Sequence, residues 1–586
     1  MLLLLGLTLT IVAYAGTLRF EFVYDDLPQI VSNPAVQSWR RVPGYFLHHV
    51  WSHIYPTWPG NYYRPLFLLW LRVNHAIFGL RPLGWHFSTV AAHLGVTAMV
   101  FWLARRITHD DVAAAVAATI FGLHPAHVET VAWVSGVSEP LLALLFIPAF
   151  VFYMNARERP QERVKWIALS LLMFALALLS KETAIVLPGL IFGYEWLGHG
   201  LPDNDAGESA NAQPREASYS EPWAAKLERS VLATLPYAAL GLVYLAVRQL
   251  VLKAFAHPEA HVPLSAVMLT WPSLLWLYAR HLAALGRMSL FYDEGYVYHP
   301  GLVNFWLPLA AVAAIAACVV AWSRRSKPAA LASLWLLLPL LPPLASIGIF
   351  GNGEIVHDRY LYLPSIGVAI LVALAIERLP ARGRLLQLPA TEVAATLVLA
   401  IALGAATIVG SVHWANNLLL YYDGVQQAPR NVLARIHLGT EMLSRHDITS
   451  AMRLYYQAHD LAPDSWSANF VLGFINFGTG RFTEAEKWLR AGIRITPENP
   501  NQYLYLGLTL MNEGRFDEAA ASIQHGADLW PQGPGFHYGL GLVAQKKGEL
   551  RGAVSEFQKE LAIDPTSGAW RNIAQIEAQM RAAQQR

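Results

Sequence analysis

Long apolar runs and ordinary polar sequence divide the chain into two regions. Residues 85–411 are mostly apolar runs, whereas residues 430–586 have the mixed character of a soluble domain. A membrane-crossing helix needs about 20 mainly apolar residues to span ~30 Å of hydrocarbon. By that criterion the candidate spans are twelve: 2–18, 85–104, 112–124, 138–154, 166–180, 183–198, 230–250, 268–288, 302–322, 329–349, 360–377 and 390–411.

Basic residues orient these spans, because short cytoplasmic turns collect Lys and Arg. Four turns are rich in them: Arg105-Arg106, the 157–165 run, Arg324 to Lys327, and Arg378 to Arg384. All four can face one side only if a segment between 200 and 322 does not cross. Segment 268–288 carries Arg280, His281 and Arg287 and is better suited to the interface, so we predict about eleven crossings.

This orientation places the first loop (19–84), the 251–301 region and the C-terminal region on the outer face. The polar insert at 199–228 stays cytoplasmic. "VAYAG" near residue 14 offers an alternative, since it resembles a signal-peptide cleavage site. No basic residue precedes Arg19, however, which disfavours cleavage.

A 34-residue repeat organises the C-terminal region. Prolines recur at 429, 463, 497, 531 and 565, and Leu-Gly steps begin at 438, 472, 506 and 540. Ala451, Ala485, Ala519 and Ala553 keep the same register. This period and pattern are those of tetratricopeptide repeats (TPRs), which stack into a solenoid with a concave binding surface. The predicted fold is all-α: a membrane domain (1–411), a linker (412–431), and a TPR domain (432–586) of four repeats and a capping helix.

Composition adds few constraints. The chain is 55% hydrophobic and 14% charged, against about 25% charged in a soluble domain. A net charge of +2 implies no nucleic-acid partner, and the single Cys318 excludes an intrachain disulfide.

Charged and imidazole side chains gather in the predicted outer-face loops. Ionisable groups at or near membrane depth are costly, so they are candidates for function. The first loop carries Asp25, Asp26 and Arg64, and the later ones carry His124, His127, Glu129, Glu139, Lys181, Glu182, His357, Asp358 and Arg359. A carboxylate can act as general base toward a hydroxyl, while Arg and Lys can hold a phosphate leaving group.

Each candidate also has a structural interpretation. Asp25-Asp26 before Leu-Pro fits a loop and helix cap. Lys181 and Glu182 could form an interfacial ion pair with a snorkelling lysine. His124 and His127 could bind a metal with Glu129, but Pro125 lies between them and no further ligand is fixed by spacing. We therefore assign no metal site.

Five motifs, in order and followed by TPRs, resemble the TMTC-type protein O-mannosyltransferases. They are "FVYDDLPQIVSNPAV", "YYRPLFLLWLRVNHAIFGLRPLGWH", "FGLHPAHVETVAWVSG", "SKETAIVLP" and "DRYLYLPSIG". The resemblance implies a GT-C glycosyltransferase fold, a polyprenyl-phosphate-linked sugar donor, transfer with inversion, and no required cofactor, a divalent cation remaining open. It also implies that Asp25 and Asp26 are catalytic and that Asp358, Arg359 and Tyr360, with the "HPxHxE" and "KE" motifs, bind substrate. One departure is Val137-Ser138, where relatives often carry a basic residue.

Three functions remain open at this point. The first is O-glycosylation of protein Ser and Thr, with the TPRs holding acceptor or partner protein; the resemblance implies mannose as the sugar, and the residues themselves do not identify it. The second is a GT-C transferase acting on a glycan or lipid, and the third is a non-enzymatic TPR scaffold for envelope assembly. A transporter would place its ionisable groups near the midplane instead. Short loops suggest a bacterial inner membrane with periplasmic TPRs, and endoplasmic reticulum residence is the alternative.

Overall fold

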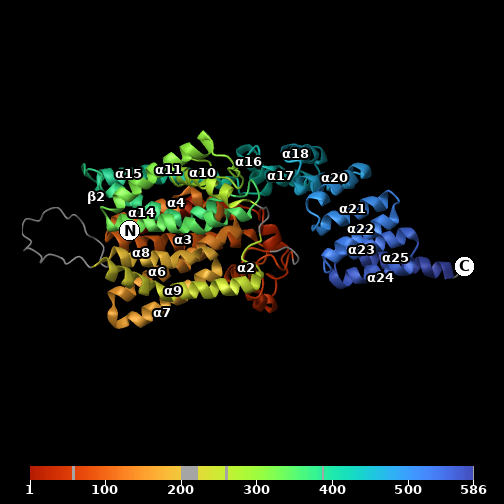
Figure 1. Cartoon of the computed structure of the whole chain (residues 1–586), viewed down its shortest axis with the longest axis horizontal. Helices are drawn as coiled ribbons and strands as arrows, with labels where there is room; N and C mark the ends of the chain where they lie inside the picture. The colour runs from red at the N-terminus through yellow and green to blue at the C-terminus, as the bar shows by residue number, and fades with distance from the viewer. Residues whose placement is uncertain (56–59, 199–221, 258–261, 285, 386–387, 585–586) are drawn as a thin grey trace, which may run out of the picture. The chain divides into compact units, whose positions relative to one another are not determined.

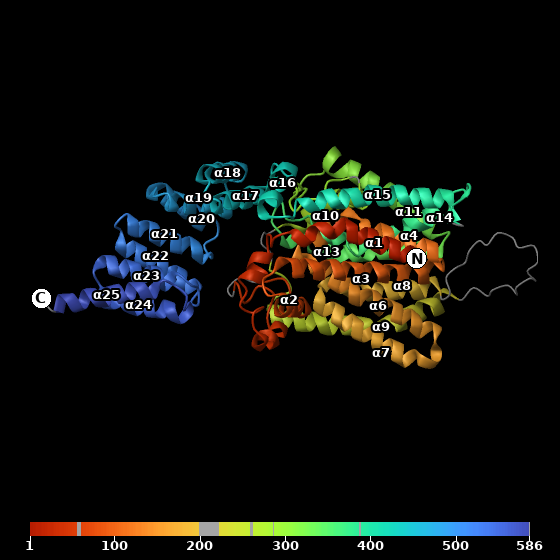
Figure 2. The same cartoon turned by 180° about the vertical axis from the view of Figure 1, so that it is seen from behind.

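The computed structural model describes residues 1–55, 60–198, 222–257, 262–284, 286–385 and 388–584. It divides into two compact units, residues 1–427 and 428–586, named here the membrane unit and the repeat unit. Most of the predicted 199–228 insert and part of the 251–301 region lie outside the described residues. Figures 1 and 2 show the helices of each unit from opposite sides.

The membrane unit is a bundle of helices with one short hairpin. Its elements are α1 (Leu2–Tyr14), α2 (Pro65–Phe78), α3 (Pro82–Thr108), α4 (Asp111–Leu123), α5 (Val128–Ala132), α6 (Ser138–Glu158), α7 (Arg163–Ser180), α8 (Leu187–Leu197), α9 (Trp223–Leu252), α10 (Leu264–Leu282), α11 (Leu307–Ser323), α12 (Lys327–Leu337), α13 (Leu341–Ser346), α14 (Pro364–Glu377), β1 (Arg384–Leu385), β2 (Leu388–Pro389), α15 (Ala390–Val412) and α16 (Asn417–Gln427). Strands β1 and β2 pair antiparallel.

Eight helical segments in the described residues are long and apolar enough to cross a membrane, or up to nine if the bent pair α4–α5 is one span. This corrects the expectation of about eleven crossings. Two expected spans are short helices, α8 with 11 residues and α14 with 14. At 1.5 Å per residue these helices reach only about 17 and 21 Å. Segment α10, predicted not to cross, is not among the eight.

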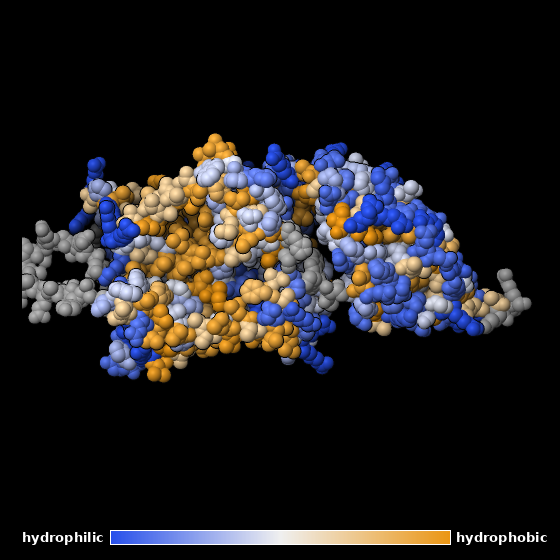
Figure 3. Space-filling model, in the orientation of Figure 1, coloured by the Kyte–Doolittle hydropathy of each residue, from blue (hydrophilic) through white to orange (hydrophobic). Residues whose placement is uncertain are grey.

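The exterior of the membrane unit agrees with a lipid environment. Figure 3 shows apolar residues over the long helices, whereas polar residues predominate over the repeat unit. Helix α11 is the extreme case, because only 6% of its apolar window is buried inside the protein. An apolar helix with so little protein contact is stable only where its surroundings are also apolar.

A buried ion cluster ties together the helix ends opposite the first loop. The carboxylate of Glu195 in α8 is fully buried. It accepts a hydrogen bond from Tyr153 of α6 and pairs with Arg157 at 2.9 Å and with Arg229 of α9 at 3.3 Å. A buried carboxylate is costly unless it is paired in this way, so this cluster has a structural explanation.

The repeat unit consists of helix pairs, as the 34-residue period predicts. The pairs are α17 (Val432–Ser444) with α18 (Ile448–Leu461), α19 (Trp466–Gly478) with α20 (Phe482–Ile495), α21 (Pro500–Asn512) with α22 (Phe516–Leu529), and α23 (Phe536–Lys547) with α24 (Leu550–Ile563), followed by α25 (Ala569–Gln584). Each second helix ends two residues before one of the periodic prolines. The four alanines of the register are fully buried.

The Leu-Gly step has the predicted packing role. A Cβ on Gly507 would lie 2.3 Å from a side-chain carbon of Ile523, sixteen residues later, and Gly439, Gly473 and Gly541 face Tyr455, Leu489 and Phe557 in the same way. Only glycine allows the two helices of a pair to approach this closely.

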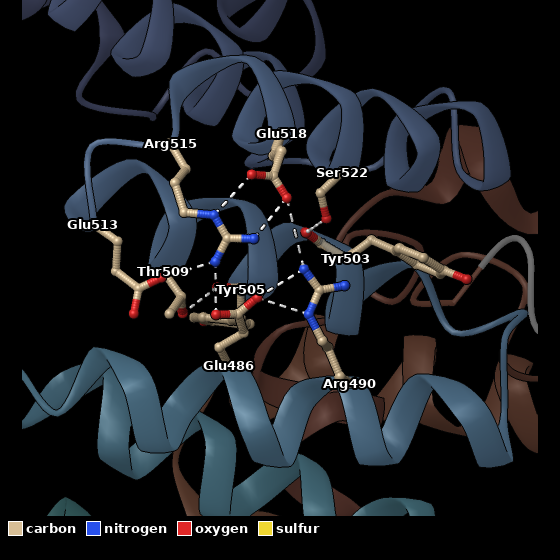
Figure 4. Close-up of polar contacts among 9 residues, drawn as sticks. All are labelled: Glu486, Arg490, Tyr503, Tyr505, Thr509, Glu513, Arg515, Glu518 and Ser522. Carbon is tan, nitrogen blue, oxygen red and sulfur yellow. Dashed lines mark hydrogen bonds and ion pairs between the residues drawn. The ribbon is translucent and has the colours of Figure 1, made fainter.

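Charged side chains link successive pairs on the repeat surface (Figure 4). Arg515, just before α22, reaches Glu486 of α20 at 2.8 Å and Glu518 at 2.6 Å. Arg490 adds a 2.7 Å contact to Glu486. Exposed pairs contribute little individually, so buried apolar contacts carry most of the stability of this unit.

Candidate active site

Hydrogen bonds from Val23 and from Ser135 fix Asp26 of the first loop. Its side chain is fully buried and accepts bonds from the Ser135 amide at 2.8 Å, the Ser135 hydroxyl at 2.7 Å and the Val23 amide at 3.2 Å. Burial raises the pKa of Asp26 to about 6, and these bonds oppose the rise. Asp26 therefore anchors the loop to the segment that follows α5, and its lone pairs are largely occupied.

Asp25 has different surroundings. Its side chain is partly exposed and has no hydrogen-bond or ion-pair partner among the described residues. Burial raises its pKa from 3.8 to about 7; the charge of Asp26 adds to the rise, and the nearby positive charge of Arg359 opposes it. A carboxylate with an accessible oxygen and a pKa near neutrality is suited to accept a proton.

The break between α4 and α5 positions Glu129. Pro125 disfavours helical geometry at the residue before it, and His124 is accordingly extended (φ −71°, ψ 125°). The helices bend by 52° here. Glu129 then accepts two bonds from Arg359, 2.9 Å from its amide and 2.5 Å from its guanidinium.

The two histidines of this turn have structural partners. His124 Nε2 lies 3.0 Å from the Leu282 carbonyl, and its Nδ1 accepts from the Ala126 amide, so the ring donates through Nε2. His127 Nε2 lies 2.8 Å from the Ser365 hydroxyl. Both rings thus have protein partners, and no group of three or more possible metal ligands is found in the described part of the chain.

Lys181 and Glu182 do not pair with each other. Lys181 ends α7 in extended geometry (φ −161°, ψ 139°), so consecutive side chains diverge. Lys181 contacts Glu139 of α6, both being almost fully buried. Glu182 accepts from Arg64 Nε at 2.9 Å, and this guanidinium holds the pKa of Glu182 at about 2. The interpretation as one interfacial ion pair was therefore wrong.

Residues 357–360, just before α14, make two kinds of contact: hydrogen bonds within the fold and contacts with charged or aromatic side chains of the cluster. Asp358 accepts from Tyr292 at 2.5 Å and lies 2.8 Å from His281 Nδ1, so it is held within the fold. Tyr360 lies under two cations, with Lys181 Nζ 5.3 Å and the Arg359 guanidinium 5.5 Å from its ring centre. The His357 ring packs edge-on against Tyr360 at 5.2 Å.

The structure thus brings most of the predicted residues into one cluster at one end of the membrane unit, near the first loop seen in red in Figure 2. Arg64, Lys181 and Arg359 each pair with a carboxylate, whereas the Asp25 side chain has no ion-pair partner among the described residues. His124, His127 and Asp358 instead support the surrounding fold.

Sequence reasoning missed several contributors. Ser135 holds Asp26, and Trp133 lies under Arg359 at 5.6 Å, yet both belong to an apolar stretch with no polar pattern. Asn417 bonds the Tyr24 amide from nearly four hundred residues away. Glu139 was among the ionisable candidates of the predicted outer loops, but it was not assigned a role in substrate binding; the structure pairs it with Lys181.

Comparison with known proteins covers both units. The family model described as dolichyl-phosphate-mannose-protein mannosyltransferase matches residues 63–197, and tetratricopeptide repeat models match 442–506 and 504–568. The first match includes Arg64, Glu129 and Lys181 but neither aspartate of the first loop.

Curated relatives extend the match. Protein O-mannosyl-transferase TMTC3 of Homo sapiens is 27% identical over 61% of this chain and 40% of its own length. TMTC1 of the same species is 26% identical over 72% of this chain and 51% of its length, and TMTC4 is 25% identical over 76% and 64%. The chain thus spans about half the length of these relatives.

Among solved structures, the crystal structure of MamA is 22% identical and covers 28% of this chain and 94% of that one, with a TM-score of 0.24. The family and relative matches confirm the resemblance seen in the motifs: this chain is similar to the TMTC-type proteins, with a membrane unit similar to protein O-mannosyl-transferases followed by TPRs.

Proposed function

We propose that this protein is a membrane glycosyltransferase that moves a sugar, mannose by its relatives' names, from a polyprenyl-phosphate donor to Ser or Thr hydroxyls of a protein. The observation that carries the proposal is the Asp25 carboxylate, which has a pKa near 7, the positive charge of Arg359 nearby, and no hydrogen-bond or ion-pair partner among the described residues. Arg359, Arg64 and Lys181 are each held by a carboxylate. A lipid-linked donor has its chain in the bilayer and its phosphate at the interface, which is where this cluster would lie.

The proposed reaction is a single inverting displacement. Asp25 accepts the proton of the acceptor hydroxyl, whose oxygen forms a bond to the anomeric carbon of the sugar. The bond from that carbon to the phosphate oxygen breaks, and the lipid phosphate leaves with the electron pair. Arg359 and Arg64 stay charged because Glu129 and Glu182 raise their pKa values, so they can stabilise the departing phosphate.

Asp26 is assigned a supporting role. Three hydrogen bonds hold its carboxylate, and its negative charge helps to raise the pKa of Asp25. A base with a pKa near the working pH combines a large deprotonated fraction with useful basicity. The pair then acts as one base and one anchor.

The repeat unit offers a surface for a protein segment. An open cavity of about 650 Å³ is lined mainly by residues of α17, α19, α21 and α23, with a contribution from the second helices of two pairs. Aromatic residues in its lining include Tyr455, Phe470, Phe474, Tyr505 and Tyr538. Of its described lining residues, Glu560 and Asp564 are the charged ones, and both are acidic. We assign this groove to an extended acceptor or partner segment with few carboxylates. Tethering would raise the effective acceptor concentration, up to mM levels.

The test is sugar transfer in membranes that carry the protein, supplied with radiolabelled polyprenyl-phospho-mannose. Label should enter protein with the wild type and fall by about 10²- to 10⁴-fold with Asp25→Asn. Glu21→Gln is the matched control, since Glu21 is an exposed carboxylate on the same loop. Label in a glycan or lipid fraction would favour the second function, and equal transfer by Asp25→Asn and wild type would remove Asp25 from the mechanism.

A further inference from the structure

The residue before Asp25 has an unusual backbone conformation. Tyr24 has a φ of +52°, in the left-handed region that non-glycine residues seldom adopt. A tight turn follows, in which the Asp26 amide donates to the Val23 carbonyl at 3.0 Å and the Leu27 amide to the Tyr24 carbonyl at 3.3 Å. Such a conformation persists only where the surroundings hold it.

A segment near the C-terminal end of the membrane unit's sequence is hydrogen-bonded to this turn. The side-chain oxygen of Asn417, the first residue of α16, accepts a hydrogen bond from the Tyr24 amide at 2.9 Å. Two residues before Asn417, the Ala415 carbonyl accepts from the Glu21 amide at 3.0 Å. Residues 21–24 are thus bonded at two points to the connection between α15 and α16.

Aromatic rings close the same turn from the side. The Tyr24 ring lies 5.8 Å from Trp133, and Trp133 stacks on Trp414 at 6.1 Å with an interplanar angle of 25°. The Arg359 guanidinium lies over the Trp133 ring. The connection between α15 and α16 therefore contacts both the backbone that carries Asp25 and the ring beneath Arg359.

Asp25 depends on this support more than its neighbour does. Asp26 is fixed through its own side chain, whereas the Asp25 side chain has no such bond among the described residues. The location of its carboxylate is then set by the backbone on either side. We propose that Asn417 is a positioning residue for Asp25, its side-chain oxygen holding the left-handed Tyr24 that aims the carboxylate at the acceptor. This inference rests on the proposed transferase function.

Two readouts on the full chain test it. The first is hydrogen exchange of the peptide containing residues 20–27, which needs no enzymatic activity. Asn417→Ala should speed exchange there, because the Tyr24 amide loses its acceptor. The second is the transfer assay, where Asn417→Ala should lower kcat at least tenfold with little change in the acceptor KM. The acid limb of its pH profile should move to lower pH, because a displaced Asp25 is better solvated.

Asn416→Ala is the matched control. The Asn416 side chain caps α16 by accepting from the Leu419 amide at 3.0 Å. This variant therefore loosens the start of α16 but keeps the acceptor of the Tyr24 amide, so its kcat should fall much less than that of Asn417→Ala. Glycine adopts positive φ without strain; Asn417→Ala should therefore cost less kcat in a Tyr24→Gly background than in wild type. Unchanged exchange, or faster exchange with unchanged kcat, overturns the positioning role. A wild type without transfer activity would overturn the proposed function instead, and exchange would still decide whether Asn417 holds the loop.

Discussion

At the scale of single residues, two adjacent aspartates receive different chemistry from their surroundings. Asp26 points into the fold and is satisfied by Ser135 and Val23, while Asp25 stays partly exposed and unpaired among the described residues. The backbone turn at Tyr24 separates the two side chains. The dipeptide therefore combines a loop anchor, as its capping pattern suggests, with a candidate base.

The raised pKa of Asp25 predicts a stability effect with a definite sign. The folded protein binds this proton up to a pH of about 7, whereas the unfolded chain releases it near the ordinary value of 3.8. Rising pH therefore favours the unfolded chain between these values, and the full penalty is present above 7. Asp25→Asn should raise the thermal midpoint of the purified protein by a few degrees at about pH 8, and by much less at about pH 5.

Glu21→Gln should leave that midpoint unchanged at both pH values. A thermal midpoint of Asp25→Asn below that of the wild type at about pH 8 would show that folding does not raise the pKa of Asp25.

At the scale of elements, breaks in helices place the site residues. The break at Pro125 follows the end of α4 and places Glu129 against Arg359. The extended backbone at Lys181 follows the end of α7, so Lys181 and Glu182 point toward different partners. The Lys181–Glu139 contact joins α7 to the first turn of α6 in a nearly solvent-free position. Burial lowers the pKa of Lys181, and Glu139 opposes that change.

Removal of one partner from this contact should be costly. Lys181→Met leaves Glu139 buried without a counter-charge, which is expected to destabilise the fold by about 3–5 kcal/mol. The double variant Lys181→Met/Glu139→Gln should recover most of the loss. Thermal unfolding in lipid nanodiscs measures both. Lys165→Met, which breaks an exposed pair with Glu162 at the other end of α7, should change stability by at most about 1 kcal/mol.

The repeat helices give a second test at this scale. Gly507→Ala would bring a Cβ to 2.3 Å from Ile523 and 2.8 Å from the Ala519 carbonyl, so α21 and α22 must separate. Hydrogen exchange in these two helices should become faster. Gly478→Ala at the end of α19 meets nothing within 4 Å and should be neutral or slightly stabilising. Equal effects of the two substitutions would contradict the close-approach explanation.

At the scale of the whole molecule, a membrane unit with the candidate site is followed by a unit built for binding. The predicted boundaries at 411 and 432, the bacterial setting and the outer-face location of the repeats stay predictions. What the two units contribute to transfer can be separated, because each is compact by itself.

Deletion of residues 428–586 should lower transfer into protein acceptors while sparing a short Ser- or Thr-containing peptide supplied at mM concentration. The reason is that the deletion removes acceptor tethering but leaves the cluster around Asp25 intact. Incorporation into both acceptors, measured side by side, tests this. Unchanged transfer into protein would favour a transferase whose repeats recruit other partners. Retained function of an Asp25→Asn/Asp26→Asn chain would favour the scaffold.

The sequence determined what is periodic or covalently local. Apolar runs specified the membrane helices, and the 34-residue register specified the repeat pairs down to which glycine lies against the next helix, because helix formation and close packing follow from local spacing. The sequence also predicted that the charged loop residues lie at the same end of the membrane unit. Only the tertiary structure decided which charge pairs with which, since Glu139 with Lys181 and Arg64 with Glu182 are joined across the chain. Likewise, Asn417 and Ser135 could be linked to the aspartates only by folding, because hydrogen bonds between distant residues leave no periodic trace in one sequence.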